Sequence, residues 1–436
     1  MTQKSIFLET YGCQMNMSDS ELIKAILSKE GYSFVAEESQ ADIVMLNTCS
    51  VRENANTKVY TRINEIKGKK RKSVLVGVLG CMATNFKTAL LENPKLKIDF
   101  ISGPDSYKQL PGLIEEAGGK GPKPFDVTLS EFETYSDVYP NREAGINAWV
   151  SIMRGCNNFC TFCVVPYTRG RERSRDPFNI VEEIKHIVAK GGSQVTLLGQ
   201  NVNSYKYEDY DFADLMKMVS DVEGVKRIRF TSPHPKDFPR KLLQLMADRP
   251  NICKQLHMPL QAGSSRVLDK MNRTYTKEEF LELVTEIRTL MPQAYLSTDI
   301  IVGFPSETAE EFEETLDVVR QSRFDQAFTF KYSPRKNTLA DRKFPDDVPE
   351  EEKGRRLSAL VDVQRQISLE KNLAQIGQIQ EVLIEEEGSK KSSDDFKGRN
   401  DGNTIVIFPR GEYKTGEYIS VKIVDATSSV LKGAVI

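Results

Sequence analysis

Short hydrophobic runs alternate with amphipathic stretches along the first 120 residues. Three of the runs favour β-strands, and each leads into a cysteine: 5–12 into Cys13, 41–48 into Cys49, and 73–80 into Cys81. Helical periodicity follows at 18–29 and 51–66, and a third helix is expected after Cys81. Strands that alternate with helices predict a parallel sheet with right-handed crossovers.

The three cysteines occupy equivalent places in this pattern. The carboxyl ends of parallel strands open on one edge of a sheet, where ligands bind. Cys13, Cys49 and Cys81 can therefore converge although 36 and 32 residues separate them. The alternative interpretation is three unrelated, small, buried residues.

The pattern breaks at AGGKGPKP (117–124) and resumes as a second series of strands and helices. Six strands are expected, within 148–155, 194–200, 227–232, 255–261, 295–304 and 326–333. Helical patterns lie between most of them, at 177–189, 212–222, 276–290 and 309–322. Six such units predict a partial (β/α)6 barrel with its active face at the carboxyl ends of the strands.

A long charged helix at 349–376 is followed by sixty residues that alternate without helical periodicity, which favours a small β-barrel or sandwich. The fold class is therefore α/β, with an N-terminal parallel α/β domain, a central partial barrel and a small C-terminal β domain. The expected domains are 1–120, 147–375 and 376–436, with a linker at 121–146.

Composition and charge argue against several classes of protein, namely disordered, membrane-spanning, nucleic-acid-coating and disulfide-rich proteins. A hydrophobic content of 39% with 28% charged residues predicts folded domains, and no uncharged run approaches the ~20 residues of a membrane span. No apolar leader is seen, so a cytoplasmic location is expected. A net charge of −2 excludes a globally basic nucleic-acid coat. Seven cysteines, an odd number, argue against a disulfide framework, and three histidines are too few for an evident Cys/His zinc site.

The strongest chemical signal is RGCNNFCTFC, in which Cys156, Cys160 and Cys163 directly follow the first barrel strand. Four thiolates close an iron–sulfur cluster or a structural zinc site, so three leave one metal position open. The alternative is a zinc loop whose fourth ligand lies elsewhere, at Cys253 or a histidine. Otherwise Cys253 is expected to be a buried structural thiol.

This loop on a six-unit β/α domain resembles the radical S-adenosylmethionine (SAM) superfamily. In that superfamily the three cysteines hold a [4Fe-4S] cluster, and SAM chelates the fourth iron. The remaining motifs resemble methylthiotransferases: YGCQMN, NTCSVRE and LGCMA in the N-terminal part; VVPYTRGRERSR, LLGQNVNSY, HMPLQAGS, STDIIVGFPSET and YSPR in the barrel. The last sixty residues are placed like that family's RNA-binding TRAM domain.

Within the family, VVPYTRG and LLGQNVNSY are most similar to the branch that modifies N6-isopentenyladenosine in tRNA. The resemblance implies a second [4Fe-4S] cluster on Cys13, Cys49 and Cys81. It also implies methylthiolation at adenine C2 of nucleotide 37, with one SAM giving a 5′-deoxyadenosyl radical and another methylating a sulfur on the auxiliary cluster. A side-chain base alone is inadequate for this C2–H, so a cofactor must carry the step.

The resemblance also implies SAM contacts at the strand ends, at Gly199, Gln200, Ser232, His257, Gln261, Ile301 and Gly303. For the polar residues the alternative is an ordinary strand-end hydrogen bond. Tyr332 could stack on a base or pack. Two loops depart from the family pattern: Ser306 replaces a glycine, and 337–339 replaces Gly-Thr-Pro.

RNA binding requires local positive charge. Around the cluster loop, Arg154, Arg169, Arg171, Arg173 and Arg175 face a single Glu172, and the last four are the candidate RNA contacts. KGKKRK (67–72) is a second basic run or a solvated helix end. From Gly377 the chain has eight basic and ten acidic residues, so an RNA role there depends on the resemblance.

The expected partners are a tRNA anticodon stem-loop carrying N6-isopentenyladenosine, an electron donor such as flavodoxin or ferredoxin, and sulfur-delivery or cluster-assembly proteins. A monomer that does not bind membranes is expected. Two other functions remain open: a ribosomal-protein aspartate methylthiotransferase, and a zinc-stabilised RNA-binding protein without catalytic activity.

Overall fold

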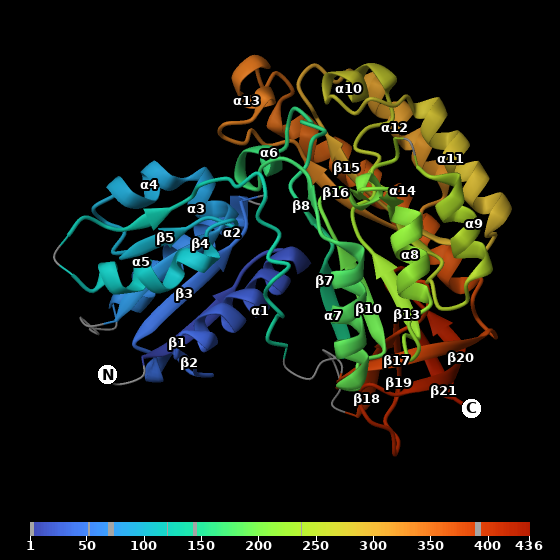
Figure 1. Cartoon of the computed structure of the whole chain (residues 1–436). Coiled ribbons are helices and arrows are strands. Elements are labelled where there is room, and N and C mark those ends of the chain that lie inside the picture. The colour runs from blue at the N-terminus through green and yellow to red at the C-terminus, as the bar shows by residue number, and fades with distance from the viewer. Residues whose placement is uncertain are drawn as a thin grey trace.

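The computed structural model describes residues 4–50, 53–68, 74–119, 121–142, 146–236, 238–388 and 394–436. An N-terminal α/β unit, a central barrel-like unit and a small C-terminal barrel follow one another along the chain (Figure 1). This arrangement confirms the predicted fold class.

The N-terminal unit is a six-stranded parallel sheet in the order β2-β1-β3-β4-β5-β6. Its strands are β1 (Ser5–Thr10), β2 (Ser33–Phe34), β3 (Ile43–Thr48), β4 (Leu75–Gly80), β5 (Phe100–Ser102) and β6 (Phe125–Asp126). Its longer helices are α1 (Gln14–Lys29), α2 (Glu53–Gly68) and α5 (Leu110–Ala117). The edge strand β6 comes from the stretch that we expected to be a linker.

Alternate residues of β3 face opposite layers of this unit. Ile43 and Met45 pack with α1 and α5, whereas Val44 and Leu46 pack with α2. Burial of both faces explains why the first four residues of the strand, 43–46, are all apolar, as expected for a parallel sheet covered by helices. The carboxyl ends of β3 and β4, which lead into cysteines, point to one edge.

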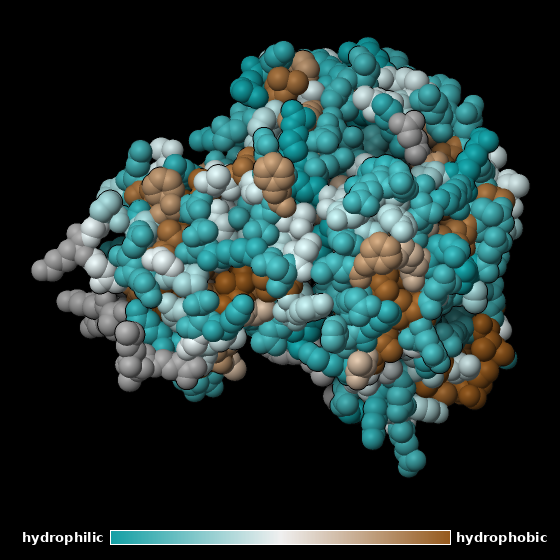
Figure 2. All heavy atoms as spheres, in the orientation of Figure 1, coloured by the Kyte–Doolittle hydropathy of each residue, from teal (hydrophilic) through white to brown (hydrophobic). Residues whose placement is uncertain are grey.

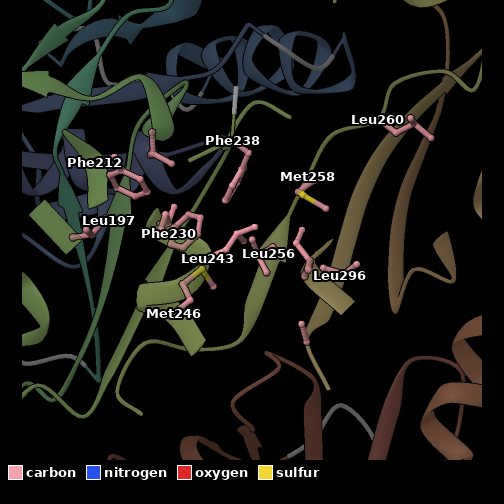
Figure 3. Packing of buried hydrophobic residues seen from close by; sticks show 14 of the residues in the cluster. Leu197, Phe212, Phe230, Phe238, Leu243, Met246, Leu256, Met258, Leu260 and Leu296 are labelled. Carbon is pink, nitrogen blue, oxygen red and sulfur yellow. The ribbon is translucent and has the colours of Figure 1, made fainter. Parts of the chain in front are cut away.

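The central unit holds two three-stranded parallel sheets, β13-β10-β7 and β14-β15-β16, joined by a bridge between Ile228 and Ile252. The strands are β7 (Asn147–Ser151), β10 (Gln194–Leu198), β13 (Arg227–Phe230), β14 (Gln255–His257), β15 (Tyr295–Val302) and β16 (Gln326–Lys331). The helices are α7 (Pro177–Ala189), α8 (Phe212–Ser220), α9 (Arg240–Asp248), α10 (Ser265–Lys270), α11 (Lys277–Leu290), α12 (Ala309–Ser322) and α14 (Glu350–Leu373). Leu197, Phe230 and Leu256 project from three of these strands into the core (Figure 3).

The C-terminal unit is a closed barrel in the order β17-β18-β19-β21-β20. Its strands are β17 (Ile379–Glu387), β18 (Asp395–Arg399), β19 (Ile405–Pro409), β20 (Tyr418–Ala426) and β21 (Val430–Val435). The hydrophobic pattern did not reveal β18, whose sequence DFKGR has one large apolar residue. Gly398 is required there because a Cβ would lie 2.3 Å from the Leu383 carbonyl oxygen.

The C-terminal barrel contacts the amino ends of the central strands, opposite the cluster loop (Figure 1). At this contact Arg229 donates to the carbonyl oxygens of Asn400 and Asp401 at 2.8 and 2.7 Å. Arg227 likewise donates to the Arg399 and Glu381 carbonyls. The barrel is thus held by buried guanidiniums that satisfy backbone acceptors.

Most of the face shown in Figure 2 is hydrophilic, with hydrophobic residues gathered near the C-terminal barrel. Exposed side chains of that region include Ile379, Val424 and Ile436. Among the described helices, none combines the length and apolarity needed to cross a membrane.

Candidate active site between two cysteine triplets

The first triplet lies in the loop between β8 (Met153–Arg154) and α6 (Val165–Thr168). Gly155 opens this loop with φ = 80°, and a Cβ there would lie 2.0 Å from the Arg171 carbonyl oxygen. Thr161 anchors the middle of the loop, because its N–H and hydroxyl donate to the carbonyls of Met271 and Lys270 at 3.0 Å. The loop backbone is therefore fixed on both sides of Cys160.

The thiols of this triplet lie close enough to influence one another. Burial, together with the charge of Cys160, raises the pKa values of Cys156 and Cys163 to about 12. Arg273 donates from Nη1 to Cys160 Sγ at 3.3 Å, and its other nitrogens donate to Tyr275 Oη and the Pro259 carbonyl. A buried cation thus faces one of the three sulfurs.

The second triplet gathers at the edge of the N-terminal sheet. Cys13 is the N-cap of α1, Cys49 follows β3, and Cys81 begins α3 (Cys81–Asn85) after β4. The glycines before two of them permit the close approach. A Cβ on Gly12 would lie 2.6 Å from Cys49 Cβ, and one on Gly80 would lie 2.5 Å from the Thr48 carbonyl oxygen.

The surroundings of these thiols shift their pKa values in opposite directions. A hydrogen bond from Cys49 lowers the pKa of Cys13 to about 6, and the charge of Arg169 adds to the effect. Burial raises the pKa of Cys81, and the charge of Cys13 raises it further. Arg169 donates from Nε to Cys81 Sγ at 3.2 Å.

The six thiols of the two triplets are not arranged around a single metal ion. Among the described residues, no three His, Cys, Asp or Glu side chains are placed to hold one metal ion. A [4Fe-4S] cluster is a different kind of centre, in which each thiolate binds its own iron. All seven cysteines are thiols, and none forms a disulfide.

A single carboxylate connects the two triplets. Asp19, on α1, accepts from Arg154 Nη2 through Oδ1 and from Arg169 Nη2 through Oδ2, both at 2.7 Å. All three side chains are almost fully buried. Burial alone would raise the pKa of Asp19, but the charges of Arg169 and Arg154 outweigh it and lower the pKa. Since Arg154 precedes Cys156 by two residues, the ion pair ties both cysteine-bearing edges together.

The proposed SAM contacts lie at the carboxyl ends of the strands, although several have structural partners. Gln200 Oε1 accepts from the Gly155 N–H at 2.6 Å, so it holds the start of the cluster loop. A Cβ on Gly199 would lie 2.6 Å from Met153 Cγ. Ser232 follows β13 with φ = 56°. These residues border the loop, and their contact with SAM stays a prediction.

The other predicted SAM contacts lie on β14 and β15 or in the residues that follow these strands. His257 bonds Ser297 through Nδ1 at 3.0 Å and Asp299 through Nε2 at 3.3 Å. Gln261 and Ile301 are joined through the backbone at 2.9 Å. Gly303 has φ = 71°, and a Cβ there would lie 2.4 Å from Lys353 Cγ. These also stay predictions.

The arginine-rich segment is mostly not a surface for phosphate, which corrects the sequence analysis. Arg169 binds Asp19, Arg173 binds Asp105 at 2.8 Å, and Arg175 binds Glu183 at 2.7 Å. All three are buried. Arg171 alone is exposed, with its guanidinium 4.4 Å from the Phe159 ring centroid. The local charge count failed because the neutralising carboxylates lie outside the segment: Asp19 and Asp105 come from the N-terminal unit, and Glu183 comes from the following helix α7.

The structure also describes part of the basic run 67–72, Tyr332, and the two loops that depart from the family pattern. Of KGKKRK, residues 69–72 lie outside the described residues. Tyr332 is buried and packs edge-to-face on Phe304. Ser306 and Asn337 have φ of 68° and 74°, a left-handed conformation that suits the glycines they replace.

Sequence reasoning missed Asp19 and Arg273. For Asp19 a signal existed: it lies on the apolar stripe of α1 with Met15, Leu22 and Ile26, where a lone charge requires a partner. No local pattern marks Arg273, because its partner Cys160 lies 113 residues away.

Three parts of the chain match known protein families. Residues 150–319 match the radical SAM superfamily, residues 373–436 match the TRAM domain, and residues 5–103 match a family described as "Uncharacterized protein family UPF0004". Among solved structures, a radical S-adenosylmethionine methyltransferase from Kitasatospora setae with cobalamin and a [4Fe-4S] cluster bound is 13% identical, with a TM-score of 0.58 over 78% of this chain and 77% of that one. That likeness supports the fold alone.

Curated relatives align along nearly the whole chain. The tRNA-2-methylthio-N6-dimethylallyladenosine synthase of Phocaeicola vulgatus is 46% identical over 99% of this chain and 95% of its own length. The protein of the same name from Chloroherpeton thalassium is 47% identical over 98% and 95%. The chain therefore belongs to the tRNA-2-methylthio-N6-dimethylallyladenosine synthase family of radical SAM enzymes.

Proposed function

We propose that this enzyme adds a methylthio group to C2 of N6-dimethylallyladenosine (N6-isopentenyladenosine) at position 37 of tRNA, beside the anticodon. The observation that carries the proposal is the full-length identity of 46% to synthases of that name. The two cysteine triplets, joined through Asp19 across one interface, support it, since the reaction requires a radical source and a sulfur source together.

The first triplet is proposed to hold the [4Fe-4S] cluster that binds SAM, and the second an auxiliary [4Fe-4S] cluster. When bound, the first cluster and SAM supply a 5′-deoxyadenosyl radical, and the auxiliary cluster supplies the sulfur that a second SAM methylates. The chain contributes position and charge. Arg273 places a buried cation on Cys160, and the anchored Thr161 backbone keeps that cysteine in place.

The inner face of the central unit offers apolar surface for a prenylated base. Phe328 and Phe330 on β16 are 42% and 37% exposed. They pair in register with Asp299 and Ile301, and the Phe328 ring lies 5.8 Å from that of His257. Lys331 points the other way, toward Glu350 of α14. The two phenylalanines therefore line the interior, where a dimethylallyl group would bury them.

The proposed RNA partner is the anticodon stem-loop, whose unstacked bases suit enzymes that act on a base. The C-terminal barrel is proposed to bind the same tRNA as a TRAM domain. Electrons would come from a donor such as flavodoxin or ferredoxin, and sulfur from delivery or cluster-assembly proteins. We propose a cytoplasmic monomer.

The decisive test is mass spectrometry of tRNA from a strain that lacks this gene. Loss of the 2-methylthio group, with N6-dimethylallyladenosine accumulating and restored by the intact gene, is the expected result. Normal 2-methylthio modification would exclude the tRNA assignment. Loss of an aspartate methylthio group from a ribosomal protein would identify the alternative methylthiotransferase.

Anaerobic reconstitution tests the two clusters. About eight irons and eight sulfides per chain are expected, because each [4Fe-4S] cluster contributes four of each. One zinc without sulfide would instead indicate the zinc-stabilised RNA-binding protein. The single variant Cys49→Ala, which keeps the other six cysteines, should still cleave some SAM but should no longer transfer a methylthio group.

A further inference from the structure

A buried guanidinium lies directly on the auxiliary triplet. Arg169 is 3% exposed and donates from Nε to Cys81 Sγ at 3.2 Å. Its Nη2 donates to Asp19 at 2.7 Å. Arg169 belongs to the central unit, six residues after Cys163, so it contacts a cysteine of one triplet from the segment that bears the other.

The hydrogen bonds of this arginine are incomplete. Its third nitrogen, Nη1, is buried and has no hydrogen-bond partner among the described residues. A buried donor without a partner is costly, and a guanidinium more so than a neutral group. Nη1 therefore has a donor still unused, next to Cys81, for a further acceptor.

The buried charges around Asp19 do not cancel. Arg154 and Arg169 share that one carboxylate, and the neighbouring Arg173 is matched by Asp105. Among the arginine and aspartate side chains of this cluster, one positive charge is in excess, in a region almost closed to water. Buried charges are normally paired, and cluster thiolates and sulfides are anionic. An anion on the second triplet would supply the missing counter-charge.

We propose that Arg169 is a positioning residue for the auxiliary cluster: it fixes Cys81 through Nε, offers Nη1 to a cluster or cluster-bound sulfur, and is itself held by Asp19. This inference rests on the auxiliary cluster of the proposed function. Cationic donors to thiolate and sulfide stabilise the reduced cluster, so Arg169 raises its reduction potential. It also strengthens iron retention, because Cys81 keeps its orientation.

The test uses the full chain with Cys156→Ala, Cys160→Ala and Cys163→Ala, which leaves only the auxiliary triplet. Arg169→Met and Arg169→Lys are compared with Arg323→Gln, which removes a surface pair with Glu370. Redox titration followed by EPR gives the midpoint potential. Iron per chain after gel filtration with a chelator measures retention.

Arg169→Met should shift the potential to a more negative value and lose at least half of the iron that the parent retains. Arg169→Lys keeps the charge but cannot bond Asp19 and Cys81 together, so its potential and its iron retention should lie between those of the parent and of Arg169→Met. If the methionine variant does not fold, the lysine variant alone tests the inference. Arg323→Gln should match the parent.

The outcomes separate the inference from the proposed function. If the parent triple variant holds about four irons and both Arg169 variants match it in potential and retention, the role of Arg169 is overturned while the auxiliary cluster stands. If the parent holds no cluster, the auxiliary cluster itself is wrong, and the role of Arg169 fails with it.

Discussion

Cys160 differs from the other thiols of its loop by its contact with Arg273. Cys160→Ala should abolish formation of 5′-deoxyadenosine from SAM, because a cluster without this ligand cannot present an open iron in the required place. Chromatography of anaerobic reactions with dithionite measures this product. Cys253→Ala is the matched control: it is a buried thiol outside both triplets and should keep the activity. Product formation by Cys160→Ala would contradict the assignment of the cluster.

His234 links the pH of the solution to the stability of the central unit. Burial lowers its pKa from 6.5 to about 3, and the nearby charge of Arg273 contributes. The ring is 7% exposed, Nδ1 accepts from the Lys236 N–H, and Nε2 has no partner among the described residues. The folded chain therefore binds this proton less readily than the unfolded chain does.

The sign of the effect follows from linkage. Above pH 6.5 neither state binds the proton, and as pH falls below 6.5 the unfolded state gains it first, so stability is lost between pH 6.5 and 3. At pH 5 the loss is about 2 kcal/mol for this group. The fall in apparent melting temperature of the apo chain from pH 7 to pH 5 should shrink in His234→Gln. The control is His186→Gln, at an exposed position of α7, whose melting temperature should decrease as much as that of the parent.

At the scale of elements, β16 carries the substrate prediction. Phe328→Ala or Phe330→Ala removes a half-exposed ring whose burial by a dimethylallyl group contributes roughly 1–2 kcal/mol, so kcat/KM should fall roughly 5- to 30-fold. Phe132→Ala, an exposed phenylalanine of the N-terminal part, is the control. The measurement is methylthio transfer to a prenylated anticodon stem-loop. Equal rates for all three variants would remove the two rings from the site.

Periodicity predicted the elements well where one face is apolar and a cap marks the start. The helix expected at 309–322 is α12, which begins after Thr308 with a capping box to Glu311. The pattern failed for β18, where charged residues and Gly398 replace alternating apolar ones. Such a strand is defined by its neighbours β17 and β19, which no local window contains.

The candidate site was predictable in its cysteines but not in its charges. The cysteines of the second triplet stand at the ends of three strands, where topology brings them to one edge of the sheet, and those of the first triplet share one loop. The arginines from 169 to 175 read as a basic surface because their partners Asp19, Asp105 and Glu183 come from other elements. Long-range pairing is a property of the packed fold, so counting charges in a segment cannot reveal it.

At the scale of the whole molecule, the two ends of the central unit have separate tasks. The cysteine loop lies at the carboxyl ends of the strands, whereas the C-terminal barrel binds the amino ends. The eight residues of β15 span roughly 26 Å between these ends. If the barrel binds tRNA as proposed, the RNA has to span this length to place its base at the cysteine loop, and the orientation of the barrel should then affect the reaction.

Arg229 is the side chain through which that orientation can be tested. Arg229→Met removes the two guanidinium donors to the Asn400 and Asp401 carbonyls, whereas Arg227 keeps its own bonds to the barrel. The barrel should therefore be held less firmly while its own strands stay paired. Affinity for tRNA should fall roughly 10- to 100-fold, because two surfaces no longer bind one RNA with a fixed geometry.

SAM cleavage by Arg229→Met without tRNA should match that of the parent, since Arg229 lies at the far end from the cysteine loop. Filter binding and 5′-deoxyadenosine assays measure the two effects, and faster proteolysis at 374–378 would report the weakened contact between the barrel and the central unit. Arg249→Gln, which breaks an exposed pair with Asp221, should change none of the three. If Arg229→Met bound tRNA as tightly as the parent, the barrel's fixed position would have no part in recognition.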